Sequence, residues 1–109
     1  MAYVPEQGDL AWINFDPRVG REQARNRPAL ILTASDFNTA TGSLVVCPVT
    51  RTERPWRTRV TLVGTTTGFV MIEQVKSLDW QARGAAFIER VPQSLLDDVK
   101  SRIATMLDL

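Results

Sequence analysis

Histidine is absent from the 109 residues of this chain. Its absence excludes the usual general base at neutral pH, every catalytic triad built on imidazole and nearly every zinc site. Carboxylates do not replace it, because no DxD or DxxE spacing occurs and the adjacent pair Asp97 and Asp98 falls early in a helical pattern, where negative charge suits the helix dipole. The sequence therefore predicts neither a metal ion nor a cofactor.

Cysteine is nearly absent as well, since Cys47 is the only one and cannot form an internal disulfide. It sits in an apolar run, so we expect a buried, unreactive thiol rather than a nucleophile. No apolar run approaches the roughly 18 residues of a membrane span, and the N-terminus has neither the basic region nor the long apolar stretch of a signal peptide. We therefore expect a cytoplasmic protein without membrane contact, and its length predicts one domain over residues 1–109.

The chain has little net charge, +1, but that charge is unevenly distributed. Residues 16–27 carry +2 and residues 51–59 carry +3, which leaves −4 for the rest of the chain. Planar guanidinium groups bind phosphate through paired hydrogen bonds. Two arginine-rich loops on an acidic body therefore indicate a localised anion site; the alternative is a solvated surface that happens to use arginine.

The stretch from Gly8 to Thr33 reads as two apolar strands joined by a polar loop. The first strand, over residues 10–15, mixes alternation with continuous apolar character, as a strand buried largely on both faces would. The second, over residues 28–33, reads the same way. The turn formers between them leave a loop of roughly a dozen residues, and ordered loops of that length in a compact domain are usually functional.

The remaining chain reads as further short strands and one terminal helix. The predicted strands cover residues 43–50, 57–63, 69–78 and 86–91, and a turn or short helix covers residues 35–42. Pro48 cannot donate a ladder hydrogen bond, so its strand should lie at an edge, carry a bulge or end there. From Pro92 onward, apolar residues recur at three- and four-residue spacing, which predicts an amphipathic helix. These elements favour a small, mainly β fold, an antiparallel sheet curled into a partial barrel with helical cover, although propensity alone leaves a sandwich open.

Several short motifs follow one another along nearly the whole chain. They are GDLAWINFDPxxGxEQAxxRPALIL from Gly8, Cys47-Pro-Val-Thr50, Glu73-Gln-Val-Lys-Ser77, Asp79-Trp80, Ala82-Arg-Gly84 and the closing helix. In this order and at this spacing they resemble the MazF/PemK family of toxin endoribonucleases from type II toxin–antitoxin pairs. The resemblance implies an SH3-like antiparallel barrel with a C-terminal α-helix, a homodimer, and a cognate MazE-like antitoxin whose acidic, disordered tail lies across the RNA groove.

The same resemblance maps the family's catalytic arginine and threonine onto Arg27 and Thr50, and the active-site glutamate of some members onto Glu22. Arg27 precedes the second strand and Thr50 ends the third, so both side chains can reach one phosphate if these strands are neighbours. RNA can be cleaved without a metal when its 2′-hydroxyl attacks the adjacent phosphorus, and a guanidinium and a hydroxyl then offset charge on the phosphorane. Glu22 can accept the 2′ proton or orient Arg27, and the nearby arginines favour orientation because they keep a carboxylate ionised.

Each of these assignments has a structural alternative. Arg27 can pair with Glu22 at the surface, Thr50 can cap the end of its strand, and Glu22 can be a solvated loop charge.

Further residues are candidates for binding single-stranded RNA, whose base edges are accessible as those of an A-form duplex are not. They are Arg18, Arg21, Arg25, Arg51, Arg54, Trp56, Gln74 and Lys76. Trp56 is the candidate stacking platform for an unpaired base, whereas Trp12 and Trp80 are expected in core or dimer contacts. In a continuous strand Gln74 and Lys76 share one face, where they can read a base edge and hold a phosphate; the alternative is a buried hydrogen-bond network around Gln74.

The sequence therefore predicts a metal-independent, sequence-specific endoribonuclease toxin. Barrels of similar shape also serve in CcdB-type toxins, which bind DNA gyrase and catalyse nothing, so a gyrase-binding toxin is the alternative. An RNA-binding barrel that has lost catalysis is a third hypothesis. The chain departs from some relatives at Asn14 and Arg25, in or beside the predicted active loop, so no particular cleavage motif can be carried over.

Overall fold

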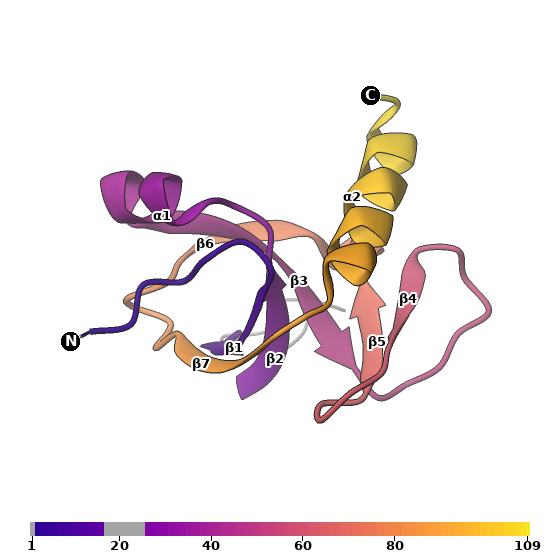
Figure 1. Cartoon of the computed structure of the whole chain (residues 1–109), viewed down its shortest axis with the longest axis horizontal. Coiled ribbons are helices and arrows are strands. Elements are labelled where there is room, and N and C mark those ends of the chain that lie inside the picture. The colour runs from indigo at the N-terminus through magenta and orange to yellow at the C-terminus, as the bar shows by residue number, and fades with distance from the viewer. Residues whose placement is uncertain (1, 17–25) are drawn as a thin grey trace.

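The computed structural model describes residues 2–16 and 26–109, whose elements are arranged as Figure 1 shows. In chain order they are β1 (Asp9–Asn14), β2 (Asn26–Ile31), α1 (Ser35–Thr41), β3 (Ser43–Thr50), β4 (Arg59–Leu62), β5 (Gly68–Met71), the 3₁₀ helix η1 (Ile72–Gln74), β6 (Lys76–Asp79), β7 (Ala86–Arg90) and α2 (Gln93–Leu107). Within the described ranges the strands form one antiparallel sheet in the order β4-β5-β3-β2-β1-β7, with β6 paired to β3. The sheet curls into a half-barrel, so the expected mainly β architecture with a C-terminal helix is confirmed.

β3 is the central strand of this sheet, so of the three alternatives for Pro48, an edge, a bulge or the end of its strand, the edge is wrong. β2 pairs along one side of β3, whereas the other side pairs with β6 up to Val46 and with β5 from Val49 onward. The carbonyl of Val45 accepts a hydrogen bond from the N–H of Leu32, so the backbone N and O of Val45 face β2. Along a strand these groups face alternate sides from one residue to the next, so those of Pro48 face the other side, between β6 and β5. The missing N–H of Pro48 therefore falls where the strand changes partners, and no ladder hydrogen bond is lost there.

Hydrophobic clusters lie on both faces of the sheet, as β1 shows. Leu10 belongs to a hydrophobic cluster beneath α2, whereas Ala11 and Ile13 belong to a second cluster with Trp80. The expected burial of this strand on both faces therefore holds only at its start, because Trp12 and Asn14 are exposed and beyond Ala11 only the face of Ile13 and Phe15 stays buried. The expected place of Trp80 in the core is confirmed. Cys47 is fully buried in the first cluster, and burial raises the pKa of its thiol to about 12, as expected for an inert cysteine.

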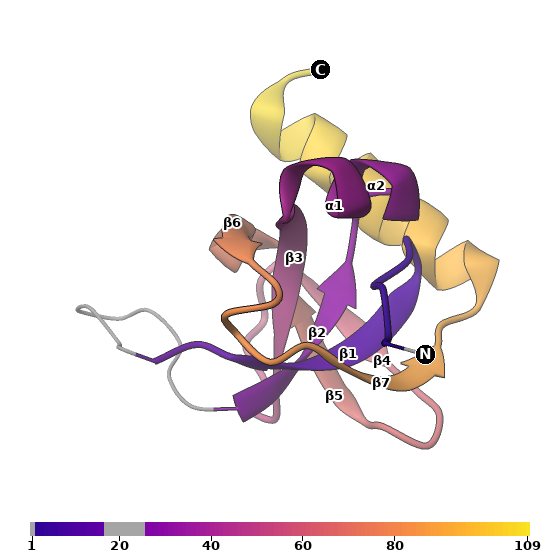
Figure 2. The same cartoon turned by 90° about the vertical axis from the view of Figure 1, so that its left-hand side faces the viewer.

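The C-terminal helix α2 covers the first cluster through its apolar stripe. The residues of that stripe that pack there are Leu95, Leu96, Val99 and Ile103. Figures 1 and 2 show α1 and α2 at one end of the molecule, while the C-terminal end of β3 and the start of β2 lie at the other. Among residues 2–16 and 26–109 no helix combines the length and the apolar character needed to cross a membrane.

The continuous strand predicted over residues 69–78 is interrupted. The chain forms η1 at Ile72–Gln74 and re-enters the sheet only at Lys76. Glu73, in the middle of η1, forms an ion pair with Arg59 of β4 at 3.1 Å, and Val75 donates its N–H to the carbonyl of Ile72. Gln74 and Lys76 therefore do not alternate along one strand, and the expected shared face is wrong.

Candidate active site

An open pocket of about 650 Å³ lies at the end of the sheet opposite the helices. Its walls come from the ends of β1, β2 and β3, from the start of the β3–β4 loop and from the β4–β5 hairpin. The lining residues are Trp12, Asn26, Arg27, Pro28, Val49, Thr50, Arg51, Thr52, Thr65, Thr66 and Thr67. Arg27 and Thr50, the two residues expected to share a phosphate, thus lie in the same pocket.

Arg27 is placed by the antiparallel pairing of β2 with both of its neighbours. It stands opposite Ile13 of β1, and the following Pro28 favours the extended backbone that a strand needs. The register that pairs Ala29 with Pro48 on β3 places Arg27 opposite Thr50 when continued by two residues. The β2–β3 pairing itself ends at Ala29 and Pro48, so Arg27 and Thr50 lie two residues beyond the last paired positions, where both line the same pocket.

Thr50 is the last residue of β3 and is only 7% exposed. Its Oγ1 accepts a hydrogen bond from the backbone N–H of Thr52 at 3.2 Å. A hydroxyl has two lone pairs and one proton, so this contact orients the group while its O–H still can donate. Thr50 is therefore both a strand-end cap and a fixed donor at the pocket wall.

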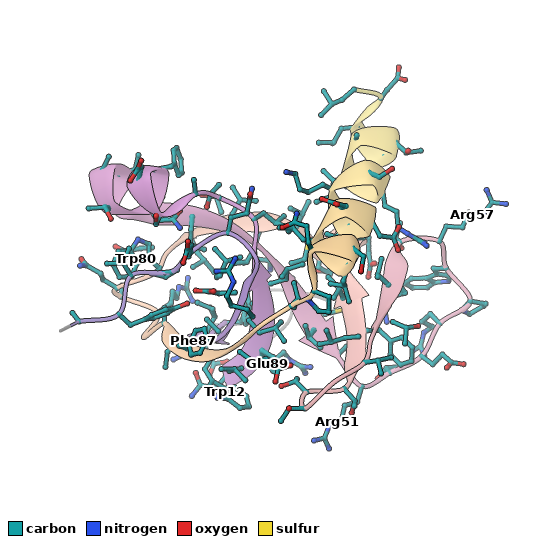
Figure 3. All side chains as sticks on the ribbon, in the orientation of Figure 1. Trp12, Arg51, Arg57, Trp80, Phe87 and Glu89 are labelled. Carbon is teal, nitrogen blue, oxygen red and sulfur yellow. The ribbon has the colours of Figure 1, made fainter. Side chains whose placement is uncertain are left out.

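The described part of the pocket is electropositive. Arg27 is half-buried and Arg51 is exposed at the rim, and Figure 3 shows Arg51 pointing away from the body of the protein at this end. None of the described residues that line the pocket is acidic. Such a site suits an anion with several oxygens, for which two guanidinium groups and hydroxyl donors are appropriate partners.

Gly68 allows the β4–β5 hairpin to pass close behind Thr50. At this position φ is +147°, and a Cβ there would lie 2.6 Å from the carbonyl oxygen of Thr50 and 3.0 Å from Cγ1 of Val49. No side chain fits at the first distance without a shift of the backbone. The glycine thus fixes how closely the hairpin approaches the residues that form the pocket.

Gly68→Ala should destabilise the protein by about 2 kcal/mol and reduce turnover, since the new methyl group pushes β3 or β5 away. Gly64→Ala is the matched control, because its φ of +156° is similar but its Cβ would meet only the Glu89 side chain, at 3.4 Å. Thermal melts and cleavage rates of the two variants check the prediction. Equal losses in both would assign the effect to backbone conformation and not to the contact with Thr50.

The other candidates of the second arginine-rich loop lie outside the pocket walls. Arg54 is exposed and donates to the carbonyl of Glu53 at 3.0 Å. Trp56 is covered on one face by the guanidinium of Arg59, 4.8 Å from its ring centroid, and Arg57 points away from the protein on another side of the molecule from Arg51 (Figure 3). Arg51 is the charged residue of this loop that lines the pocket.

Gln74 and Lys76 also do not line the pocket. Gln74 is half-buried in η1. Lys76 stands opposite Val46 on β3, and its Nζ lies 5.7 Å from the centroid of the Phe15 ring. The β3 partner of Lys76, Val46, is thus four residues before Thr50, and Gln74 is not among the described residues that line the pocket. The candidates Arg18, Arg21, Glu22 and Arg25 lie outside the described residues.

Sequence reasoning missed two parts of the pocket. Trp12 was expected in core or dimer contacts; it is 45% exposed and lines the pocket, so the core position is wrong, whereas a dimer contact stays a prediction. The segment Thr65–Thr67 also lines the pocket, and its run of hydroxyls between Gly64 and Gly68 is the sequence signal that could have indicated it. In the described part of the chain no three His, Cys, Asp or Glu side chains gather in a way that could hold a metal ion.

Comparison with curated proteins identifies relatives over nearly the whole chain. The family model described as "PemK-like, MazF-like toxin of type II toxin-antitoxin system" matches residues 6–107. The endoribonuclease toxin MazF of Escherichia coli strain K12 is 38% identical over 106 residues, which cover 96% of each chain. Endoribonuclease PemK of Escherichia coli is 39% identical over 108 residues, covering 94% of this chain and 81% of PemK.

Solved structures agree with these relatives. A crystal structure of MazF (Form-I) from Deinococcus radiodurans has a TM-score of 0.94 at 35% identity and covers 99% of this chain and 100% of that one. A MazE–MazF complex (Form-II) from the same organism has a TM-score of 0.89 at 35% identity, covering 99% of both chains. The expected barrel with a C-terminal helix is therefore the fold of solved MazF toxins. This chain belongs to the family of PemK-like, MazF-like toxins of type II toxin–antitoxin systems.

Proposed function

We propose that this protein is a sequence-specific endoribonuclease that cleaves single-stranded messenger RNA without a metal ion, as the toxin of a toxin–antitoxin pair. The observation that carries the proposal is that Arg27 and Thr50 line one open pocket, two residues beyond the last paired positions of β2 and β3. The curated relatives named MazF and PemK are endoribonucleases, which favours RNA cleavage over the gyrase-binding alternative.

The reaction is a transesterification within the RNA. The 2′-oxygen forms a bond to the adjacent phosphorus, the bond from phosphorus to the 5′-oxygen breaks, and the products are a 2′,3′-cyclic phosphate and a 5′-hydroxyl. Negative charge builds on the nonbridging oxygens of the five-coordinate phosphorane. Arg27 offers forked N–H donors with a permanent positive charge, and Thr50 offers an O–H donor held in place by Thr52.

The proton steps involve a carboxylate and water. Glu22 is the candidate that accepts the 2′ proton or orients Arg27, and the cationic surroundings favour the orienting role. Arginine is a poor proton donor because its pKa exceeds about 12. Arg27 is therefore assigned to charge stabilisation, and the departing 5′-oxygen takes its proton from solvent.

Single-stranded RNA suits this site because its phosphates and bases can reach an open pocket together. Arg51 at the rim would hold a second phosphate, with Arg18, Arg21 and Arg25 of the active loop and Lys76 of β6 as further candidates. Messenger RNA as substrate implies action in the cytoplasm.

A cognate antitoxin would restrain this activity by occupying the same electropositive pocket. Related MazF toxins from Deinococcus radiodurans have been solved in complex with MazE. An acidic, disordered tail that becomes ordered on binding would complement the charges of Arg27 and Arg51. Opposite charges speed the encounter of two chains and fix their alignment once bound.

The proposed assembly is a homodimer. Apolar residues remain exposed toward the C-terminal end of α2, where Met106 is 40%, Leu107 56% and Leu109 90% exposed. Exposed apolar side chains gathered at one end of a helix are typical of a surface that a second chain covers.

Incubation of the purified protein with single-stranded RNA in excess chelator tests the function. We expect site-selective cleavage that leaves cyclic phosphate and 5′-hydroxyl ends, and loss of cleavage when the nucleotide before the scissile phosphate is 2′-deoxy. Intact RNA in chelator, or 5′-phosphate ends, would contradict the proposal. Mapping the 5′ ends of cleaved transcripts gives the target sequence.

A further inference from the structure

Trp12 is exposed on a strand whose other central residues are buried. Its neighbours Ala11 and Ile13 are 0% exposed, whereas Trp12 is 45% exposed. Its partners across the two ladders are Pro28 of β2 and Ala86 of β7. Neither partner carries a side chain large enough to cover an indole ring, so a broad aromatic surface is left open.

This ring stands beside the proposed cleavage chemistry. Pro28, the ladder partner of Trp12, directly follows Arg27, and all three residues line the pocket that also holds Thr50. Residues paired across an antiparallel ladder have Cα atoms roughly 4.5–5.5 Å apart. By strand alternation the Trp12 ring and the Arg27 side chain project from opposite faces of the β1–β2 ladder, and both line the pocket at the ends of these strands.

A second part of the pocket lining is polar and anchored. It consists of Thr65–Thr67 of the β4–β5 hairpin, and the backbone N–H of Thr66 donates to Oε1 of Glu89 on β7 at 3.5 Å. Figure 3 shows Trp12 and Glu89 at the same end of the molecule. An aromatic face and hydroxyl groups in one pocket suit a flat base with a polar edge.

Trp56, the stacking residue expected from the sequence, is a poorer candidate. It is similarly exposed, at 49%, but lies outside the pocket, and its ring already contacts the guanidinium of Arg59. That guanidinium is held in place by Glu73 at 3.1 Å. The two tryptophans thus differ in position and not in exposure.

We infer that Trp12 is a base-stacking residue that holds one unpaired RNA base next to the scissile phosphate, with Thr65–Thr67 facing the edge of that base. The inference rests on the proposed function and adds a specificity-determining contact to it. Stacking of a base on an aromatic side chain is worth roughly 1–3 kcal/mol, so loss of the ring should weaken RNA binding about 5- to 100-fold.

The test compares Trp12→Ala with the matched control Trp56→Ala. The probe is an oligonucleotide spanning the strongest cleavage site in a bacterial messenger RNA pool, with 2′-deoxyribose at the attacked linkage so that it binds without being cut. A second set of probes replaces one base at a time by an abasic site. If the wild-type protein cuts nothing, a random single-stranded RNA pool serves as the probe.

Three results are expected together. Trp12→Ala weakens binding about 5- to 100-fold and raises KM similarly, kcat on the uncut substrate changes less than about twofold, and Trp56→Ala changes binding less than about twofold. The loss caused by Trp12→Ala should disappear with the probe that is abasic at one particular position. Trp12→Phe should retain part of the affinity.

Other results overturn the inference. These are equal effects of Trp12→Ala and Trp56→Ala, the same loss at every abasic position, or a drop in kcat without weaker binding. A change only in antitoxin affinity or in the homodimer, measured by gel filtration, assigns Trp12 to a protein contact instead. Failure of wild-type cleavage with normal RNA binding rejects the proposed function alone, whereas absence of both rejects the two together.

Discussion

Replacement of Arg27 by alanine should lower kcat for RNA cleavage about 100- to 1,000-fold. The guanidinium stands where β2 and β3 bring it to the same pocket as Thr50, and charge on the phosphorane exceeds that on the ground-state diester. An interaction that strengthens in the transition state acts mainly on kcat. Single-turnover cleavage of a mapped oligonucleotide measures the effect, and a thermal melt establishes that the variant is folded.

Two variants separate the role of Arg27 from general charge. Arg57→Ala removes the same charge from an exposed side chain that points away from the pocket (Figure 3), so it should change kcat less than about twofold after screening by salt. Arg27→Lys keeps the charge but loses the planar fork, and should recover only part of the rate. Equal rates for Arg27→Ala and Arg57→Ala would remove Arg27 from the catalytic centre.

The fold was largely predictable because hydrophobic periodicity is a local property of the sequence. The strand at Ser43–Thr50 and the helix over residues 93–107 follow the bounds that alternation and three- and four-residue spacing indicate. The edge position suggested for Pro48 was wrong because a local rule cannot tell which neighbour a strand will have at each residue. Only the assembled sheet shows that β3 exchanges β6 for β5 at that point.

The break at η1 has a similar origin. Residues 73–78 were expected to continue the strand that begins at Phe69, but Glu73 forms an ion pair with Arg59, fourteen residues earlier in the chain. That contact depends on how β4 packs beside β5, which no pattern within residues 72–78 records. Tertiary contacts of this kind override local preference.

The candidate site was predictable in part, for the same reason. Arg27 and Thr50 flank strands whose neighbour relation follows from short connections in an antiparallel sheet. Trp12 was not assigned to the pocket, because its exposure depends on how far along β1 the helix α2 covers the sheet. The sequence of β1 alone does not show this. Trp56 was overvalued, since the sequence does not show that Arg59 covers its ring.

Replacement of Thr50 by valine should also lower kcat about 100- to 1,000-fold, because it removes one preorganised donor at the developing charge. Valine is close to threonine in shape, and the residue lies 7% exposed at the end of a strand, where a β-branched side chain is suitable. The substitution also leaves the N–H of Thr52 without its present acceptor. Because Thr52 is exposed, water can replace that contact and the cost in stability should be small.

Thr50→Ser distinguishes the hydroxyl from the methyl group. Serine restores the O–H donor and the acceptor for Thr52, so kcat of Thr50→Ser should remain within about tenfold of wild type. If Thr50 acted through packing of its methyl group, Thr50→Val would instead keep a higher kcat than Thr50→Ser.

Combination with Arg27→Ala sharpens the test. If both side chains bind the same phosphorane, the double variant should lose much less than the product of the two single losses, since groups that act as a unit are not additive. Multiplicative losses would mean that Arg27 and Thr50 act independently, on different atoms of the RNA.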